Sequence, residues 1–149
     1  MYAVVRIRGT PGTDRKILDT LEMLNLKKKY NCTLIPEESS YEGMLNRVQN
    51  FVTWGEIDKE LLAKIIEKRA RHKEGKDIEE LLEENEMDST EDLAEAILEE
   101  KSLKKFNLNP TIPLSPPSGG FKNKTKKIYP KGESGYRGKE IKKLLKKMV

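Results

Sequence analysis

The feature that most constrains the fold is an alternation of short apolar runs with amphipathic segments over the first 55 residues. β-Branched and aromatic residues concentrate in three runs that are typical of strands: residues 2–8, 32–35 and 51–54. Apolar residues recur between them at helical spacing, over residues 13–24 and 39–48. Because the connections are short, this part of the chain predicts the order β-α-β-α-β and a fold that mixes helices with strands.

The first of these runs ends in a clear alternation of apolar and charged residues. Val5 and Ile7 share one face of the predicted strand, while Arg6 and Arg8 share the other. This pattern is typical of a strand with one buried face. Gly55 is predicted to end the third run.

Capping residues indicate where the two intervening helices begin. Thr13 or Asp14 is predicted to cap the first helix. Ser39 and Glu42 have the spacing of a capping box, with Ser39 as the N-cap of the second helix. Gly43 lies inside this second helix, at a cost of about 1 kcal/mol relative to alanine. It indicates either the close approach of another backbone or a ligand, or a glycine that the helix tolerates.

Residues 58–107 predict three acidic amphipathic helices. Their apolar stripes are Leu61, Leu62, Ile65 and Ile66, then Ile78, Leu81 and Leu82, then Leu93, Ala94, Ile97 and Leu98. Ser89 is expected to cap the third helix. The glutamates are interpreted as a solvated outer face, with a dedicated acidic binding site as the alternative.

The last forty residues predict an edge strand, a long polar segment and a closing helix. Residues 111–114 are assigned to an edge because Pro113 is tolerated there. Residues 115–120 form a turn-rich loop, and residues 121–127 are too polar for a core. The closing helix is expected to turn four apolar side chains inward: Ile141, Leu144, Leu145 and Met148.

Formal charge is sorted along the chain. Residues 1–54 carry 8 Lys/Arg and 6 Asp/Glu (+2), residues 55–105 carry 10 and 17 (−7), and residues 106–149 carry 11 and 2 (+9), which agrees with the total of +4. Charged residues make up 36% of the chain against about 25% in typical domains, an excess that heat adaptation also produces. The sorting, however, favours one surface that meets a polyanion and another that does not.

Few residues in the chain are suited to catalysis or metal binding. Cys32 is the only cysteine, so the chain forms no internal disulfide and no cysteine metal cluster, and a buried inert thiol in a reducing compartment is favoured. His72 is the only histidine and is placed near the end of a charged helix, where a positive charge suits the helix dipole. Three evenly spaced glycines, Gly132, Gly135 and Gly138, have no strand before them, which argues against a nucleotide-binding loop. We therefore expect no enzyme, cofactor, metal or small-molecule substrate.

The sequence carries no sign of a membrane protein. No apolar run reaches the roughly 20 residues of a membrane span, and the N-terminus lacks the apolar region of a signal peptide. A cytoplasmic location is expected.

Basic residues at loops and element ends, interleaved with aromatic residues, favour a nucleic-acid partner. The basic positions are Arg8, Arg15, Lys16, Lys27, Lys28, Lys29, Arg47, Lys122, Lys124, Lys126, Lys127 and Arg137. The aromatic positions are Tyr30, Tyr41, Phe121, Tyr129 and Tyr136. Lysine and arginine bind phosphates, and structured RNA adds unstacked bases and 2′-hydroxyls, which suit arginine, tyrosine and polar loops.

An ordered set of segments resembles a known family. The segments are Val4–Gly9, Asp19–Leu26, Asn31–Pro36, Tyr41–Met44, Phe51–Gly55, Leu114–Phe121 and the closing Ile141–Met148. Together they resemble the large-subunit ribosomal proteins of universal number thirty, whose eukaryotic relative is numbered seven. The C-terminal elaboration without a long basic N-terminal arm is similar to the archaeal members.

The resemblance implies an α+β fold, with a ferredoxin-like β-α-β-α-β core and an antiparallel sheet. Residues 1–57 would form an rRNA-binding core, residues 58–107 an acidic helical elaboration, and residues 108–149 an edge strand, basic loop and helix packed on the core. The implied function is a structural constituent of the large subunit, ribosomal in location, with neighbouring ribosomal proteins as further partners. The residues expected at the RNA are Arg6, Arg8, Arg15, Lys16, Lys27–Lys29, Tyr30, Tyr41, Arg47, Lys122, Lys124, Lys126, Lys127 and Arg137.

A different class of function stays open at this point. A small regulatory module with the same layout would bind a metabolite and dimerise through its sheet, although it gives no reason for the basic end. An enzyme that uses His72 or Cys32 is a third and weaker hypothesis. We also expect residues 118–138, which are rich in glycine and lysine, to become ordered on RNA binding.

Overall fold

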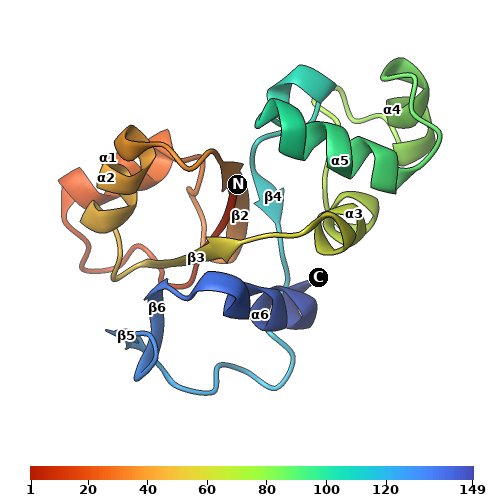
Figure 1. The fold of residues 1–149 in the computed structure, drawn as a ribbon. Coiled ribbons are helices and arrows are strands. Elements are labelled where there is room, and N and C mark those ends of the chain that lie inside the picture. The colour runs from red at the N-terminus through yellow and green to blue at the C-terminus, as the bar shows by residue number, and fades with distance from the viewer.

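The computed structural model describes all 149 residues and contains one six-stranded sheet with helices on both faces (Figure 1). The strands are β1 (Tyr2–Arg6), β2 (Asn31–Ile35), β3 (Val52–Glu56), β4 (Ile112–Pro113), β5 (Lys124–Ile128) and β6 (Gly132–Tyr136). The helices are α1 (Arg15–Met23), α2 (Ser39–Arg47), α3 (Lys59–Lys68), α4 (Ile78–Glu84), α5 (Thr90–Glu100) and α6 (Ile141–Met148). Two short 3-10 helices, η1 (Lys104–Phe106) and η2 (Gly138–Glu140), complete the chain.

The order of strands in the sheet is β4-β2-β1-β3-β6-β5. β1 lies between β2 and β3 and is antiparallel to both, so that Val4 faces Thr33 on one side and Trp54 on the other. β6, in contrast, pairs with β3 in parallel. The sheet is therefore mixed, and the prediction of an antiparallel sheet is wrong for its C-terminal side.

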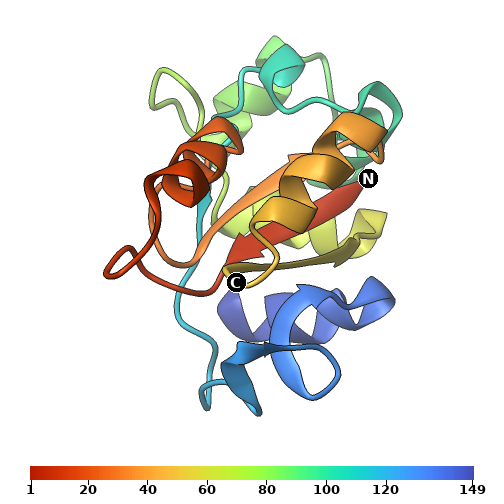
Figure 2. The same ribbon diagram turned by 90° about the vertical axis from the view of Figure 1, so that its left-hand side faces the viewer.

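Helices α1 and α2 cover one face of the sheet, as Figure 2 shows from the side of these helices. Asp14 caps α1 by accepting a hydrogen bond from the amide of Lys16 at 3.4 Å, as one of the two predicted caps. The predicted capping box of α2 is wrong, because Ser39 is already helical and Glu38 is the N-cap residue. A Cβ at Gly43 would meet no atom within 4 Å, so this glycine is merely tolerated.

The other face of the sheet is covered by the helices that follow β3. The predicted stripes of α3, α5 and α6 point inward, and Leu62, Leu93 and Leu145 are fully buried. They share one apolar cluster with Ala3 of β1 and Ile112 of β4. Residues from the N-terminal, middle and C-terminal segments thus bury a common core, which stabilises the whole chain as one unit.

Glycines allow the C-terminal strands to approach β3. A Cβ at Gly55 would lie 1.9 Å from the carbonyl oxygen of Gly138, so only glycine fits beneath η2. Gly55 lies inside β3 and does not end it, contrary to prediction. β6 was not predicted, because Gly132 and Gly135 interrupt a segment with no apolar alternation. Thr53 Oγ1 donates to the carbonyl oxygen of Gly135 at 2.9 Å and fixes β6 on β3.

His72 has a structural place that differs from the prediction. α3 ends at Lys68, and His72 lies buried in the following loop, where its backbone forms an isolated antiparallel β-bridge with Leu108. Its Nδ1 accepts from the amide of Glu74 at 2.9 Å, so Nε2 carries the proton and donates to Oε2 of Glu84 at 2.7 Å. The ring therefore ties the loop to α4 and does not complement a helix terminus.

Candidate nucleic-acid interface

Two basic segments that are far apart in the sequence meet through an aromatic pair. The rings of Tyr30 and Phe121 stack with centroids 6.4 Å apart and an interplanar angle of 28°. The ammonium group of Lys29 lies 5.0 Å from the centroid of the Tyr30 ring. The loop of Lys27–Lys29 is thereby placed beside the segment that begins at Lys122.

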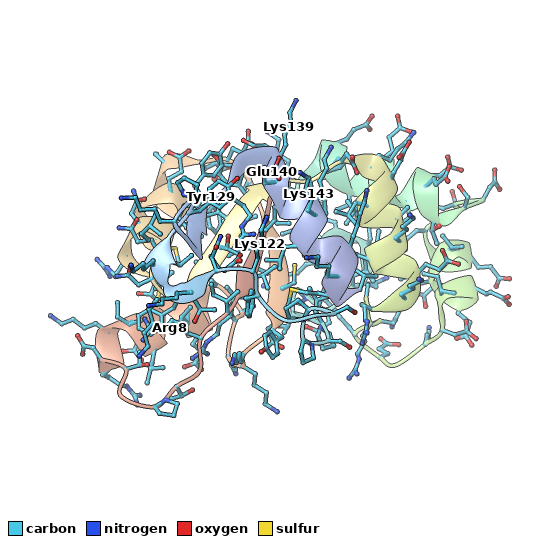
Figure 3. All side chains as sticks on the ribbon, turned by 90° about the horizontal axis from the view of Figure 1, so that it is seen from below. Arg8, Lys122, Tyr129, Lys139, Glu140 and Lys143 are labelled. Carbon is cyan, nitrogen blue, oxygen red and sulfur yellow. The ribbon has the colours of Figure 1, made fainter.

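Arg8 adds a further cation to this side of the molecule, as the view from below shows (Figure 3). Its guanidinium lies 4.6 Å from the centroid of the Phe51 ring and donates weakly, at 3.4 Å, to the carbonyl oxygen of Asn50. The side chain is partly exposed and has no carboxylate partner within 4.0 Å. A flat delocalised cation held on an aromatic ring is well suited to a phosphate or a base.

A basic cleft of about 650 Å³ separates the segment after Gly120 from α6. Lys122, Lys143, Lys146 and Lys147 line it, together with the rings of Phe121 and Tyr129. Figure 3 shows Lys122, Tyr129 and Lys143 around its mouth. The volume lies within the range of about 300–1,000 Å³ that is usual for small-molecule sites.

The floor of the basic cleft is a buried ion pair. Arg137 donates to Oε2 of Glu133 at 2.7 Å and to Oγ1 of Thr53 at 2.7 Å, and its guanidinium lies 5.4 Å from the centroid of the Tyr129 ring. Oε1 of Glu133 accepts from the amide of Asn123 at 2.9 Å. Arg137 is 9% exposed and lines the cleft, and its Nε and Nη2 donate to Thr53 and Glu133, so it holds the cleft together. Its contact with RNA stays a prediction.

Arg6, in contrast, is buried, so the expectation that its side chain faces RNA is corrected. Its side chain is 1% exposed, and Nη1 donates to the carbonyl oxygens of Leu26 and Lys27 at 2.9 and 2.7 Å, while Nε donates to that of Arg8 at 2.8 Å. Burial lowers the pKa of this guanidinium, which stays charged. The alternating pattern of β1 predicts that Arg6 points to the opposite face of the sheet from Val5. The loop after α1 covers the Arg6 face, so the side chain is buried there. Arg6 therefore positions the loop of Lys27–Lys29 from beneath.

Comparison with known proteins matches this chain to one family model and to curated relatives. The family model described as Ribosomal protein L30p/L7e matches residues 2–52, which run from β1 into β3. The large ribosomal subunit protein uL30 of Methanosphaera stadtmanae is 41% identical over 152 aligned residues, covering 100% of both chains. Those of Archaeoglobus fulgidus and Korarchaeum cryptofilum are 44% and 42% identical, over 99% and 100% of this chain and 99% and 95% of theirs.

The chain belongs to the uL30 family. The resemblance found in the sequence motifs is thus confirmed, including its likeness to archaeal members. These full-length matches include the acidic helices and the basic cleft, which lie outside the part that the family model covers. No helix of this uL30 chain has the length and apolar character that crossing a membrane requires.

The uL30 chain leaves most of its predicted basic residues free. Side chains that are exposed and have no carboxylate within 4.0 Å are Lys16, Lys28, Lys29, Arg47, Lys122, Lys124, Lys126 and Lys127. Arg15 pairs with Asp19 at 3.2 Å, and Lys27 pairs with Glu22 at 3.7 Å. Because all four of these side chains are exposed, the pairs are weak and leave the cations accessible.

Two predicted residues on α2 lie apart from the basic cleft. Tyr41 lines a separate depression of about 160 Å³ together with Lys101 and Lys104. Arg47 ends α2 and is not among the residues that line the cleft. The structure therefore brings the loop after α1 and the segment after Gly120 together, whereas Tyr41 and Arg47 do not line the basic cleft.

Three lysines of α6 line the uL30 cleft and are absent from the predicted site. Because the apolar residues of α6 face inward, Lys143, Lys146 and Lys147 fall on its outer face, and the helical pattern carries no information about what lies opposite them. Tyr129 was noted only as one of the interleaved aromatic residues. In Figure 3, the carboxylates of α4 and α5 project at the far end of the molecule, away from the labelled residues of the cleft.

Proposed function

We propose that this uL30 chain is a structural, non-enzymatic component of the large ribosomal subunit and binds the rRNA of that subunit. Its relatives are named large ribosomal subunit proteins and match it from end to end. The observation that supports an RNA-binding surface here is the meeting of two basic segments at the stack of Tyr30 on Phe121. No feature of the relatives supports the alternative of a metabolite-binding regulatory module.

The surface would bind RNA mainly through phosphates. Lysines without carboxylate partners in the loop of Lys27–Lys29 and on β5 are available to neutralise the RNA backbone, and each phosphate contact releases counterions. The basic cleft, with Lys122 at its mouth and Tyr129 on its wall, has room for an unstacked base. The apolar core and the pair of Arg137 and Glu133 support this surface from beneath, and residues 118–138 are still expected to become ordered on RNA binding.

The finer description of the fold is part of this proposal. We infer that residues 1–57 form a ferredoxin-like unit that presents the RNA surface. Residues 58–107 turn their carboxylates away from the RNA, and residues 108–149 supply the basic cleft. The segregated charge of these parts supports the division.

The salt dependence of RNA binding tests the proposal. The affinity of the chain for a transcript of large-subunit rRNA should fall linearly with salt on logarithmic axes, by about 0.7–0.9 in slope for each phosphate contact. Replacing Lys27, Lys28 and Lys29 by glutamate should weaken binding and make the slope less negative while the circular dichroism spectrum stays unchanged. A flat slope for the native chain would refute phosphate binding.

A matched variant separates contact from net charge. Lys59, Lys64 and Lys68 are exposed on α3, and their replacement by glutamate changes the net charge by the same amount. We expect this control to retain the native salt slope. Equal weakening by both triple variants would mean that overall charge, and not the loop, governs binding. In cell lysate, the chain should sediment with large subunits, whereas a free regulatory module would stay at the top of the gradient.

A further inference from the structure

A further pocket, acidic and aromatic where the basic cleft is rich in lysine, lies on the α2 side of the sheet. It has a volume of about 250 Å³ and is lined by Tyr2, Trp54 and Tyr136 from three neighbouring strands and by Glu42 and Asn46 from α2. Trp54 and Tyr136 are direct partners across β3 and β6. We call this site the aromatic pocket.

The three rings of the aromatic pocket are inclined to one another. The centroids of Tyr2 and Tyr136 are 6.1 Å apart with an interplanar angle of 68°, and those of Trp54 and Tyr136 are 6.2 Å apart at 48°. Tyr136 is 48% exposed, which is unusual for a large side chain in this protein. Inclined rings around one hollow present π-faces from more than one direction, and π-faces attract cations.

Carboxylates surround the aromatic pocket. The Tyr2 hydroxyl donates to Oε1 of Glu42 at 3.5 Å, and the Tyr136 hydroxyl donates to Oε1 of Glu56. The bond to Glu56, burial and the Glu56 charge raise the pKa of Tyr136 to about 12. Burial, followed by the charges of Glu37, Glu42 and Glu56, raises the pKa of Tyr2.

These carboxylates have almost no cationic partner within the chain. Glu42 and Glu56 have no lysine, arginine or histidine nitrogen within 4.0 Å, and Glu37 has only the N-terminal amino group at 3.6 Å. The hollow therefore combines π-faces with uncompensated negative charge. That combination repels a phosphate backbone, although the rings alone would accept a base.

We propose that the aromatic pocket receives one arginine side chain from a basic segment of a protein partner. An arginine stacks its flat guanidinium on a ring and donates to carboxylates in the same plane, which a lysine ammonium does not do. The volume is below the roughly 300 Å³ at which small-molecule sites begin, and is suited to a single long side chain. The chain would thus meet RNA on its basic side and a basic protein on the α2 side.

Trp54 gives a built-in probe, because it is the only tryptophan of the chain. The full-length protein, labelled with ¹⁵N, is titrated with the capped pentapeptide Gly-Gly-Arg-Gly-Gly while the indole N–H resonance is followed. The matched control peptide carries citrulline, which keeps the shape of arginine without its charge. We expect a saturable shift with the arginine peptide and at least roughly fivefold weaker binding of the citrulline peptide.

Two variants connect this response to the aromatic pocket. Glu42→Gln removes one carboxylate charge from an exposed helix position, and Tyr136→Leu removes one half-exposed ring while it keeps an apolar side chain. Each substitution should weaken the binding of the arginine peptide by roughly threefold to tenfold. Glu99→Gln, on the exposed face of α5, should change nothing.

Several results would overturn the proposal. Equal shifts with the arginine and citrulline peptides would show that charge is not recognised. An unchanged affinity in Glu42→Gln, or an indole that does not move, would remove the aromatic pocket as the site. A larger and saturable shift with oligouridylate would identify the pocket as an RNA contact. None of these outcomes depends on whether the basic cleft binds rRNA.

Discussion

Arg6 provides the sharpest test of how the basic loop of Lys27–Lys29, which we propose binds RNA, is positioned. Arg6→Met keeps most of the buried apolar stem and removes a guanidinium that makes three hydrogen bonds of 2.7–2.9 Å to backbone carbonyls. Hydrogen bonds from a charged donor contribute about 1.5–3 kcal/mol each. The low end of the sum is about 4.5 kcal/mol, and part of it is recovered because the Lys27 and Arg8 carbonyls lie near water.

We therefore expect Arg6→Met to lower the free energy of unfolding by about 3 kcal/mol. For a chain of this length, such a loss lowers the melting temperature by about 6–12 °C. Arg6→Lys keeps the charge but loses the forked geometry, so its melting temperature should lie between those of the native and methionine chains. Differential scanning calorimetry measures all three.

The RNA-binding readout separates a positioning residue from a contact. Because Arg6 is buried, its loss should weaken rRNA binding without changing the slope against salt, provided that binding is measured below the melting transition. Lys28→Ala should do the opposite: it should leave the melting temperature unchanged and make the slope less negative by about 0.7–0.9. A full unit of slope lost in Arg6→Met, or a melting temperature within about 2 °C of native, would refute this account.

Three further predictions concern backbone approach, the thiol and acid stability. Gly55→Ala should destabilise the chain by about 3 kcal/mol or more in urea denaturation, because its Cβ would lie 1.9 Å from a carbonyl oxygen of η2. Gly43→Ala should instead stabilise the chain by about 1 kcal/mol, because a Cβ there meets no atom within 4 Å and alanine favours a helix. Burial raises the pKa of Cys32 to about 12, so mass spectrometry should find this thiol unmodified by iodoacetamide at pH 8 until the chain is unfolded. The hydrogen bond from Lys76 lowers the pKa of Glu84 to about 2. The contribution of ionised Glu84 to the free energy of unfolding should therefore be complete above about pH 4.5 and should decline as the pH falls toward 2. This pH dependence should disappear in Glu84→Gln.

The helical part of the fold was predictable because helical periodicity is a local property. The buried stripes of α3, α5 and α6, and the caps Asp14 and Ser89, lie where the residue spacing placed them. The prediction of Ser39 as an N-cap is wrong, because a capping-box spacing is also compatible with a helix that begins one residue earlier, at Ser39 itself. The covering of a strand face by a distant loop is not a local property. The alternation in the sequence therefore assigns Arg6 to the correct face but does not show that the loop after α1 buries it.

The strands β5 and β6 were missed for a different reason. β5 is rich in lysine and mostly exposed, and β6 contains two glycines, so neither has the alternation that identifies a strand. β6 is held by residues about 80 positions away, through the bond of Thr53 to Gly135 and the backbone pairing with β3. The positions of Lys122 and the lysines of α6 around one cleft follow from this long-range docking and leave no mark on the local sequence.

The docking of β6 also explains how the two ends of one short segment contribute to two surfaces of opposite charge, the basic cleft and the aromatic pocket. Successive residues of an extended chain point to opposite sides of a sheet. Tyr136 turns toward Trp54 and the carboxylates of the aromatic pocket, while the next residue, Arg137, turns toward Thr53 and Glu133 beneath the basic cleft. A shift of β6 by one residue along β3 would exchange these faces and expose an ion pair where an aromatic ring now lies. The pairing of Thr53 with Gly135 therefore sets the chemistry of both surfaces, because it fixes which of the two neighbours faces the basic cleft.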